Sequence, residues 1–445
     1  MKSIYTMIVL CFCGVLSAHA GSLPSSISTN TVLLANNSPY TMAGPVTVAK
    51  GVTLTVMPGV RIQSSGGNFT LNVNGTLQCL GKKDSLIHIE NTVVVFNAGS
   101  VGYKKSTGGG SKFLYTRFAP GQTGSAIRSS KASVFAHHCV FEDVSYAISA
   151  YTDSVDIYMS NSKILGKTNG YSIFNSYKNW HLELIEDTIV DGGYLYMGRS
   201  NVVRKCLFLG GSSTYYGLYG QAHTKEAEIS CNYFKNIYYG INFSSLVAGH
   251  GRFIIRDNYV DSSYYGLYMA SQGIEKDSFS ISGNAFTWCY YATYFLNTTA
   301  TPAPINWALP GNYWGSTDTT QIKKFIYDNR RFSMIPYRVD YTAYLNQPPV
   351  PCGPVPPGFK AGINSPKATF DMAVYPNPAN GEFRISLPGT DHYFWTLSDL
   401  NGRTIAEGTC IGQQQVSTTG LKPGSYLLQV RNSNGVQAYR PVLLH

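Results

Sequence analysis

An internal repeat constrains the fold of this chain more than any other feature. One polar or small residue followed by two mostly apolar residues recurs between Cys139 and Trp314. The copies at positions 206, 232, 258 and 284 follow one another at intervals of 26 residues. The eight copies begin at Cys139, Lys163, Thr188, Cys206, Asn232, Asn258, Asn284 and Asn312. Short repeats of this kind predict a solenoid, in which each repeat is one turn.

A second phrase, which opens with tyrosine, runs in step with the first. Its seven copies begin at Tyr146, Tyr171, Tyr194, Tyr216, Tyr239, Tyr265 and Tyr291. Two strand-like phrases per repeat, each followed by turn residues, are typical of a parallel β-helix. A helical solenoid would need amphipathic stretches with a 3.6-residue period, and the repeats show none.

Stacking explains the recurrent asparagine. Successive turns lie about 4.8 Å apart, the usual spacing of hydrogen-bonded strands, so equivalent side chains form ladders. Asparagine tolerates the left-handed backbone of a tight bend, and stacked amides bond to each other. We expect Asn232, Asn258, Asn284 and Asn312 to stack for this structural reason.

The first 20 residues have the features of a signal peptide. An apolar run from Ile8 to Leu16 follows Lys2, and Ala18-His19-Ala20 offers a small-x-small cleavage site, so Gly21 is the expected first mature residue. The run is too short to span a bilayer, and no later segment predicts a transmembrane helix.

Nine cysteines are present, and Cys11 and Cys13 lie in the signal peptide. The other seven show no metal-ligand or disulfide-framework spacing, so we expect most of them to be buried packing residues and expect no metal or cofactor. The formal net charge is +10, and its surplus precedes Ala368. That surplus favours an anionic partner such as an acidic polysaccharide, with ordinary solubility as the simpler explanation, and no nucleic-acid-binding motif is visible.

The mature chain resembles secreted parallel β-helix proteins of the pectate-lyase-like superfamily. The resemblance rests on Gly51-Val52-Thr53-Leu54-Thr55-Val56, Asn72-Val73-Asn74-Gly75 and Asn312-Tyr313-Trp314-Gly315. It implies a single-stranded right-handed parallel β-helix, which we place at residues 21–345, and it implies little about activity. The Pro- and Gly-rich residues 346–369 predict a semi-rigid linker without a packed core.

Three phrases near the C-terminus resemble the type A sorting domain of the type IX secretion system. They are Val374-Tyr375-Pro376-Asn377-Pro378, Ser398-Asp399-Leu400-Asn401-Gly402-Arg403 and Lys422-Pro423-Gly424-Ser425-Tyr426. The resemblance implies that residues 370–445 form a small β-sandwich, which an outer-membrane translocon of a Gram-negative bacterium recognises. The protein is then secreted or placed on the outer cell surface. The chain ends in Arg440-Pro441-Val442-Leu443-Leu444-His445, where this family often has a lysine-rich strand.

No intact catalytic motif of a β-helix enzyme is visible in the sequence. Two residues before the first six phrases lie His137, Asn161, Glu186, Arg204, Ser230 and Arg256. If they share one face, Glu186 and Arg204 are neighbours and could supply an acid or base for uronide cleavage. A plain surface salt bridge is the simpler interpretation of this pair.

Tyrosine, with 33 residues, is the stronger signal. Strand alternation predicts that Tyr239 and Tyr265 face the core and that tyrosines flanking a Gly or Ala column face outward. The outward set comprises Tyr215, Tyr219, Tyr238, Tyr264, Tyr268, Tyr290 and Tyr294. Such a trough could bind a glycan through aromatic stacking and hydroxyl contacts, or it could simply cover the sheet.

The sequence therefore favours a surface module that binds a glycan or adheres to a polymer, without catalysis. A polysaccharide lyase or glycoside hydrolase acting on an acidic polysaccharide is the alternative, and a purely architectural spacer is a third possibility.

Overall fold

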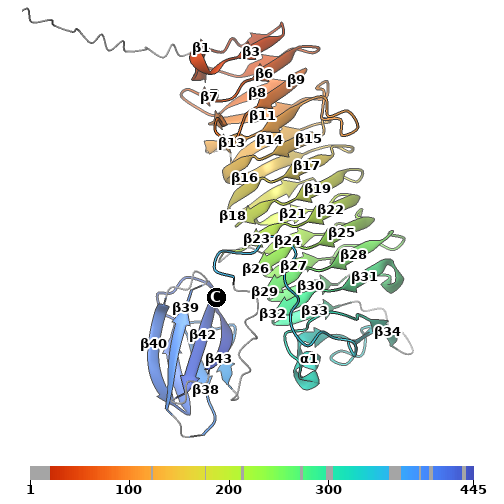
Figure 1. Cartoon of the computed structure of the whole chain (residues 1–445), viewed down its shortest axis with the longest axis vertical. Coiled ribbons are helices and arrows are strands. Elements are labelled where there is room, and N and C mark those ends of the chain that lie inside the picture. The colour runs from red at the N-terminus through yellow and green to blue at the C-terminus, as the bar shows by residue number, and fades with distance from the viewer. Residues whose placement is uncertain are drawn as a thin grey trace, which may run out of the picture.

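A computed structural model describes residues 21–121, 124–175, 177–211, 215–270, 274–296, 304–359, 372–389, 392–399, 404–432 and 437–444. The expected signal peptide and the last part of the expected linker lie outside these residues. Figure 1 shows one long stack of parallel strands, from β1 to β33, and a separate small β-domain near its C-terminal end. The predicted all-β class, a right-handed parallel β-helix followed by a small antiparallel β-domain, is confirmed.

Three faces of parallel strands surround the core. Face A contains β1 (Gly21–Ser22), β4 (Tyr40–Met42), β7 (Arg61–Ser64), β10 (Ile87–Glu90), β13 (Thr116–Ala119), β16 (Val140–Ala150), β18 (Lys163–Phe174), β20 (Thr188–Val190), β23 (Leu207–Leu209), β26 (Tyr233–Lys235), β29 (Tyr259–Asp261) and β32 (Ala285–Thr287). Face B contains β2 (Ser26–Ile27), β5 (Val46–Val48), β8 (Phe69–Val73), β11 (Thr92–Phe96), β14 (Ser125–Ser129), the second halves of β16 and β18, β21 (Tyr194–Tyr196), β24 (Tyr216–Tyr219), β27 (Tyr239–Asn242), β30 (Tyr265–Met269), β33 (Tyr291–Phe295) and β35 (Ile326–Tyr327).

Face C is the 11-stranded sheet. It contains β3 (Thr31–Leu33), β6 (Thr53–Val56), β9 (Thr76–Leu80), β12 (Lys112–Leu114), β15 (Val134–His137), β17 (Ile157–Ser160), β19 (His181–Ile185), β22 (Ser200–Arg204), β25 (Glu226–Ser230), β28 (Phe253–Arg256) and β31 (Phe279–Ser282). The α-helix α1 (Thr319–Phe325) begins at Asp318, whose carboxylate accepts the Thr320 N–H. The 3-10 helices η1 (Ala35–Asn37) and η3 (Lys276–Ser278) lie in loops, and β34 (Ile305–Ala308) pairs with β36 (Tyr337–Asp340) near the C-terminal end of the solenoid.

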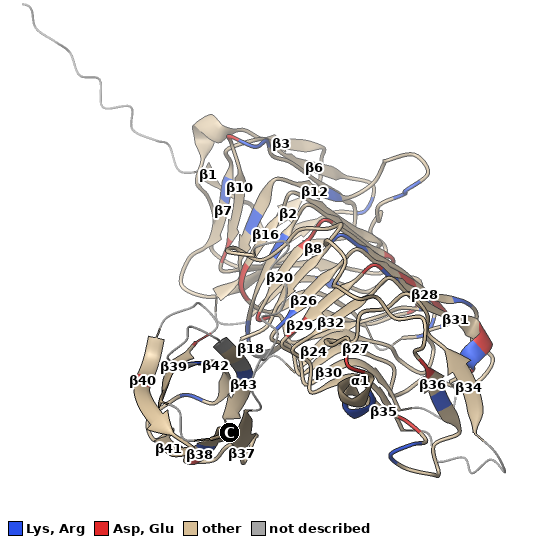
Figure 2. Ribbon diagram, turned by 60° about the horizontal axis from the view of Figure 1, so that its bottom comes forward, with Lys and Arg blue, Asp and Glu red and all other residues tan. Residues whose placement is uncertain are grey.

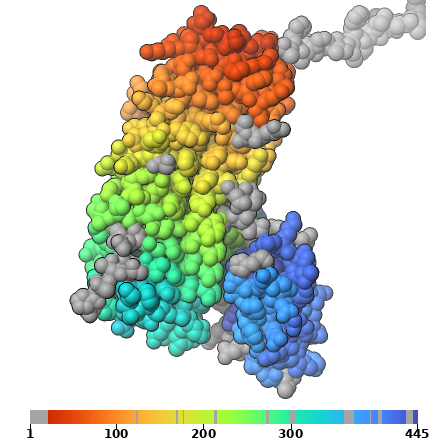
Figure 3. Space-filling model, turned by 180° about the vertical axis from the view of Figure 1, so that it is seen from behind, coloured from red at the N-terminus to blue at the C-terminus, as the bar shows by residue number. Residues whose placement is uncertain are grey.

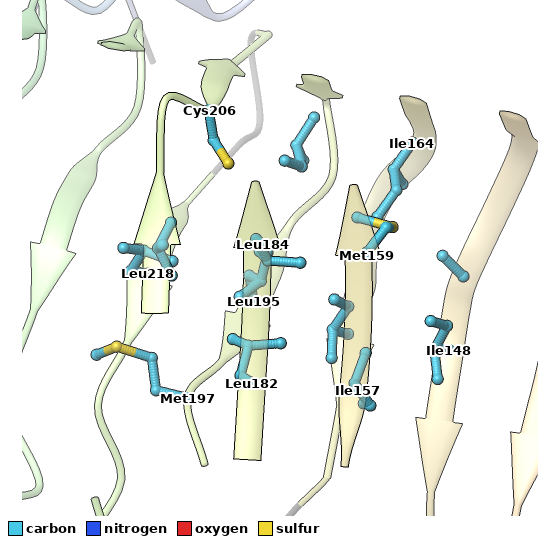
Figure 4. Packing of buried hydrophobic residues seen from close by; sticks show 14 of the residues in the cluster. Ile148, Ile157, Met159, Ile164, Leu182, Leu184, Leu195, Met197, Cys206 and Leu218 are labelled. Carbon is cyan, nitrogen blue, oxygen red and sulfur yellow. The ribbon is translucent and has the colours of Figure 1, made fainter. Parts of the chain in front are cut away.

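The core is a column of apolar side chains from all three faces. Figure 4 shows Ile148, Leu195 and Leu218 from face B meeting Ile157 and Leu182 from face C. Aromatic residues also stack in the core from turn to turn, as in Phe208 on Phe234, with centroids 4.5 Å apart. Because every turn buries its apolar side chains against the next turn, stability depends on neighbouring turns.

The predicted asparagine ladder is confirmed. The Nδ2 of Asn232 donates to the Oδ1 of Asn258 at 2.9 Å, and Asn258 and Asn284 repeat this bond to the next turn at 2.9 and 3.0 Å. Each of these amides also donates to a backbone carbonyl of face C and accepts a backbone N–H from the turn before. The ladder thereby satisfies the buried polar groups of each bend between face C and face A.

The structure corrects the alignment of two repeats. The ladder position is occupied in order by Cys139, Ser162, Asp187, Cys206, Asn232, Asn258, Asn284 and Asn312. The repeats predicted to begin at Lys163 and Thr188 are therefore displaced by one residue, because Ser162 and Asp187 are the residues in the ladder. Before the ladder residue stands one residue with positive φ, such as Glu186 (+60°), Lys205 (+52°) or Cys231 (+57°).

The residues after the solenoid return to it, contrary to the prediction of a linker without packing. A disulfide bond joins Cys231, in a bend beside face A, to Cys352. Phe359 then packs edge-on against Tyr233 and Tyr259, with centroids 5.5 and 5.6 Å away. This disulfide was not predicted. The other five cysteines of the described chain, Cys79, Cys139, Cys206, Cys289 and Cys410, are buried and free, as expected.

The C-terminal domain consists of two antiparallel sheets around one core that contains Phe383, Leu397, Leu428 and Val442. One sheet contains β37 (Ala373–Tyr375), β38 (Glu382–Ser386) and β41 (Gln413–Ser417), and the other contains β39 (His392–Ser398), β40 (Thr404–Ile411), β42 (Gly424–Asn432) and β43 (Gln437–Leu444). Two of the C-terminal motifs have structural roles. Asn377 bonds to Pro441 O and Leu443 N at 2.7 and 2.8 Å, and the Tyr426 hydroxyl donates to Lys422 O at 2.8 Å.

Candidate functional site

Face B has an outer surface built from tyrosine. Its central column consists of Tyr146, Tyr171, Tyr194, Tyr216, Tyr239, Tyr265 and Tyr291, one from each of seven successive turns. Neighbouring rings in this column have centroids between 4.4 and 5.8 Å apart. The spacing is close to the strand spacing, because each ring is held by its own strand.

Two further columns flank the central one. The outer column contains Tyr215, Tyr238, Tyr264 and Tyr290, with centroids 4.6 to 4.8 Å apart and nearly parallel planes. The inner column contains Phe174, Tyr196, Tyr219, Asn242, Tyr268, Tyr294 and Tyr327. We call the three columns together the tyrosine face.

The aromatic rings of the tyrosine face pack against one another, so that most ring planes are already in contact with a neighbouring ring. Within a column most rings are stacked, although Tyr194 and Tyr216 are tilted by 36°, whereas neighbours in different columns meet at steep angles, such as 67° between Tyr238 and Tyr239. Stacked and edge-to-face contacts are both favourable for aromatic rings, so the arrangement stabilises the face. It also means that a ligand meets mainly ring edges and hydroxyl groups, and not open ring faces.

All seven tyrosines predicted to line the trough lie on this face. The exposed fraction reaches 44% for Tyr215 and 49% for Tyr290, and Tyr238 and Tyr264 are half-buried. Between Tyr219 and Tyr268 the inner column contains Asn242, which is buried.

The predicted orientation of two tyrosines is wrong. Tyr239 and Tyr265 were expected in the core, but both are half-buried members of the central column. The Gly and Ala column was expected on the surface, yet Gly240 and Gly266 are buried. A Cβ on Gly266 would lie 2.5 Å from a ring carbon of Phe286 and 2.6 Å from Ala292 O. The expected alternation of inward and outward side chains fails here because Tyr238 and Tyr239 both point outward before Gly240 turns inward.

Burial raises the pKa of several half-buried phenols on the tyrosine face, with neighbouring tyrosines as a second cause. The pKa rises to about 12 for Tyr196, Tyr264 and Tyr291. The pKa values of Tyr239 and Tyr265 are raised for the same reasons. These five phenols therefore stay protonated, and able to donate hydrogen bonds, at any physiological pH.

These shifts predict a loss of stability in alkali. An unfolded tyrosine ionises near pH 10, whereas the folded phenols keep their protons, so the unfolded state binds fewer protons above about pH 10 and the free energy of unfolding falls as pH rises. We expect the thermal unfolding midpoint to be insensitive to these groups below about pH 9 and to fall steeply above about pH 10. Phenolate absorbance measured along the same titration should rise together with unfolding.

The double variant Tyr239→Phe/Tyr265→Phe is the matched control for that titration. It keeps the stacked rings and removes two of the titrating groups, so its midpoint should fall less steeply with pH. Equal slopes for the variant and the wild type would contradict this account.

The candidate acid–base pair is not assembled. Arg204 belongs to the column of His137, Ser160, Ile185, Ser230 and Arg256, whereas Glu186 lies one residue further on, in the bend with Lys205. The Arg204 guanidinium binds both carboxylate oxygens of Glu228, with 3.0 Å between Nε and Oε1, and Glu186 lies 3.5 Å from the Lys205 ammonium. Both candidates are held in surface ion pairs on face C and its bend.

The described part of the chain contains no group of three or more His, Cys, Asp or Glu side chains that could hold a metal ion. No helix among the described residues is long and apolar enough to cross a membrane.

Sequence reasoning missed the whole central column as a surface feature. The signal was present, because the second repeat phrase opens with the tyrosine of that column in each of the seven turns. Tyr327 was also missed, since it follows α1 and lies outside the repeat; its ring stacks on Tyr294 with centroids 4.3 Å apart.

The architecture defines the class: a parallel β-helix protein with an extended aromatic face and a small antiparallel β-domain at its C-terminus. Comparison with protein families agrees. The family described as "Right handed beta helix region" matches residues 125–286, and the family described as "Secretion system C-terminal sorting domain" matches residues 373–443. No curated protein matches the chain.

The chain is therefore a secreted or cell-surface β-helix protein that carries a type IX secretion sorting domain. The sorting domain implies an interaction with the type IX secretion machinery.

Proposed function

We propose that the solenoid is a glycan-binding or adhesion module, and that the tyrosine face binds one extended polysaccharide chain along the solenoid axis. The observation that carries the proposal is the unbroken central column of seven tyrosines, which repeats with the strand spacing. A linear polymer made of similar units meets similar contacts on successive turns of such a face.

The chemistry of the face supports a polar, hydroxyl-rich ligand. Half-buried phenols with raised pKa present protonated hydroxyls beside apolar ring edges. Sugars offer the matching combination of hydroxyl groups and C–H surfaces. Because the ring faces already pack on each other, we expect hydrogen bonds from the phenols to contribute more than ring stacking.

The absence of an assembled acid–base pair at Glu186 and Arg204 is the reason to prefer binding over the alternative of a lyase or hydrolase. The predicted domain limits and the signal peptide fit this role: residues 1–20 direct export, residues 21–345 form the module, and residues 370–445 direct sorting.

The double variant Tyr238→Phe/Tyr264→Phe tests the proposal. Phenylalanine keeps the stacked rings, so stability should hardly change, but two hydroxyls are lost. Each lost hydrogen bond costs about 0.5–1.5 kcal/mol, so affinity should fall about tenfold. The measurement is a glycan array followed by titration calorimetry with the polysaccharides that bind.

Tyr103→Phe is the matched control, because Tyr103 packs on Phe135 of face C, away from the tyrosine face. It should bind as the wild type does. The proposal is wrong if no glycan binds the wild type, or if the double variant retains full affinity.

A further inference from the structure

The tyrosine face itself contains no charge over its central strands. β21, β24, β27, β30 and β33 have no Asp, Glu, Lys or Arg. In Figure 2 the labelled strands β24, β27 and β30 are correspondingly tan. A ligand with negative groups therefore meets no acidic residue from these strands.

Basic side chains lie at the C-terminal end of the tyrosine face. The helix α1 contacts β33 and β35, and its last turn carries Lys323 and Lys324; Figure 2 shows a blue segment at this helix. Arg331 is exposed and donates to Lys324 O at 3.3 Å, and its charge partly offsets the larger effect of burial, which raises the pKa of Tyr291. The C-terminal end of the central column thus lies close to a group of basic side chains.

Arg331 and Lys323 differ from the neighbouring Arg330 in whether they form an ion pair with a carboxylate. Arg330 is bound to the buried carboxylate of Asp328 at 2.5 Å. Within the described ranges, Arg331 and Lys323 have no carboxylate within 4.0 Å. Surface arginines that already have a carboxylate gain little from a new anion, whereas the Arg331 guanidinium bonds to a backbone carbonyl and has no carboxylate partner among the described residues.

A second arginine lies at the opposite end. Arg128 of β14 is in register with Ser149 and Phe174, so it lies in line with the inner column, two strands before its first ring and separated from that ring by Ser149. Its Nε is buried and has no hydrogen-bond acceptor among the residues that the structure describes. Eight strand spacings separate Arg128 from Tyr327, or about 38 Å at about 4.8 Å each.

We infer that the ligand of the tyrosine face is an acidic polysaccharide, whose backbone lies on the tyrosines and whose carboxylate or sulfate groups pair with Arg331 at one end and Arg128 at the other. This inference rests on the proposed function. The planar guanidinium fork matches both carboxylate and sulfate. The uncharged central strands of the tyrosine face accept a polyanion without binding the negative group of every sugar unit. Specificity for acidic chains then comes from the two ends of the face.

The test compares three soluble linear polysaccharides by titration calorimetry at low and high salt: a neutral glucan, a sulfated derivative of the same glucan, and a polyuronate. The wild type should bind one or both acidic chains about tenfold more tightly than the neutral one, with the preference reduced by salt. Sulfate and carboxylate are distinguished by which acidic chain shows the preference.

Arg331→Gln and Arg128→Gln should each weaken binding of the preferred acidic chain about fivefold and leave binding of the neutral glucan unchanged. Arg252→Gln is the matched control, an exposed arginine immediately before β28 on face C. Tyr238→Phe/Tyr264→Phe should weaken all bound chains equally.

The outcomes separate the two claims. Equal affinity for neutral and acidic chains, or arginine variants that bind the acidic chain as the wild type does, overturns the inference while the proposed function stands. If none of the three polysaccharides binds and the glycan array is also empty, the proposed function fails and the inference fails with it.

Discussion

Replacing Asn258 with alanine is expected to lower the free energy of unfolding by about 4 kcal/mol, because it leaves buried polar groups of the backbone without partners. The side chain accepts the backbone N–H of Asn232 at 3.1 Å and donates to Ile229 O at 2.8 Å. It also links the amides of Asn232 and Asn284. Urea-induced unfolding followed by circular dichroism measures the loss.

The control for this variant is Ser280→Ala, an exposed position on β31. Surface substitutions of this kind change stability by less than about 0.5 kcal/mol. If Asn258→Ala costs no more than the control, the amide ladder does not contribute to stability in the way its geometry indicates.

Removing the disulfide between Cys231 and Cys352 is expected to have an effect of similar size. The bond closes a loop with a sequence separation of 121 residues. Loop-closure entropy for such a length corresponds to about 5 kcal/mol, and the packing of Phe359 on Tyr233 and Tyr259 would be weakened as well. The variant Cys231→Ser/Cys352→Ser should therefore unfold at a much lower urea concentration.

Amide hydrogen exchange of this variant should show which turns of the solenoid lose stability. In a solenoid each turn contacts only its neighbours, so exchange should rise in β25, β28 and β31 and remain unchanged near β3 and β6. Figure 3 shows the solenoid from behind as one continuous surface, coloured from red at its N-terminal turns to green and cyan at the later ones. A uniform rise along this whole length, or no change at all, would contradict a local clamp.

The sorting domain and the solenoid have separate cores, which is consistent with separate roles. Asn377 connects β43 to the start of its domain through bonds to Pro441 and Leu443. The Asn-Pro motif that led to the sorting-domain resemblance is therefore a structural element. The asparagine anchors the last strand of the domain.

The sequence by itself determined the fold class, because the residues that stacked strands require recur regularly along it. A polar residue at every bend and two apolar phrases per turn are enough to predict a parallel β-helix, and the amide ladder at Asn232, Asn258 and Asn284 follows from the same periodicity. The five buried free cysteines also agree with the scattered, unpaired pattern of their positions.

Three features were decided only by the tertiary structure. The ladder passes through Ser162 and Asp187, which polarity alone does not distinguish from their neighbours, so Glu186 and Arg204 fall in different columns. Tyr239 points outward because Gly240 turns inward against the core, and simple two-residue alternation has no means to show this. Cys231 meets Cys352 because the chain returns along face A after the last turn, and contacts over 121 residues depend on that path and not on local sequence.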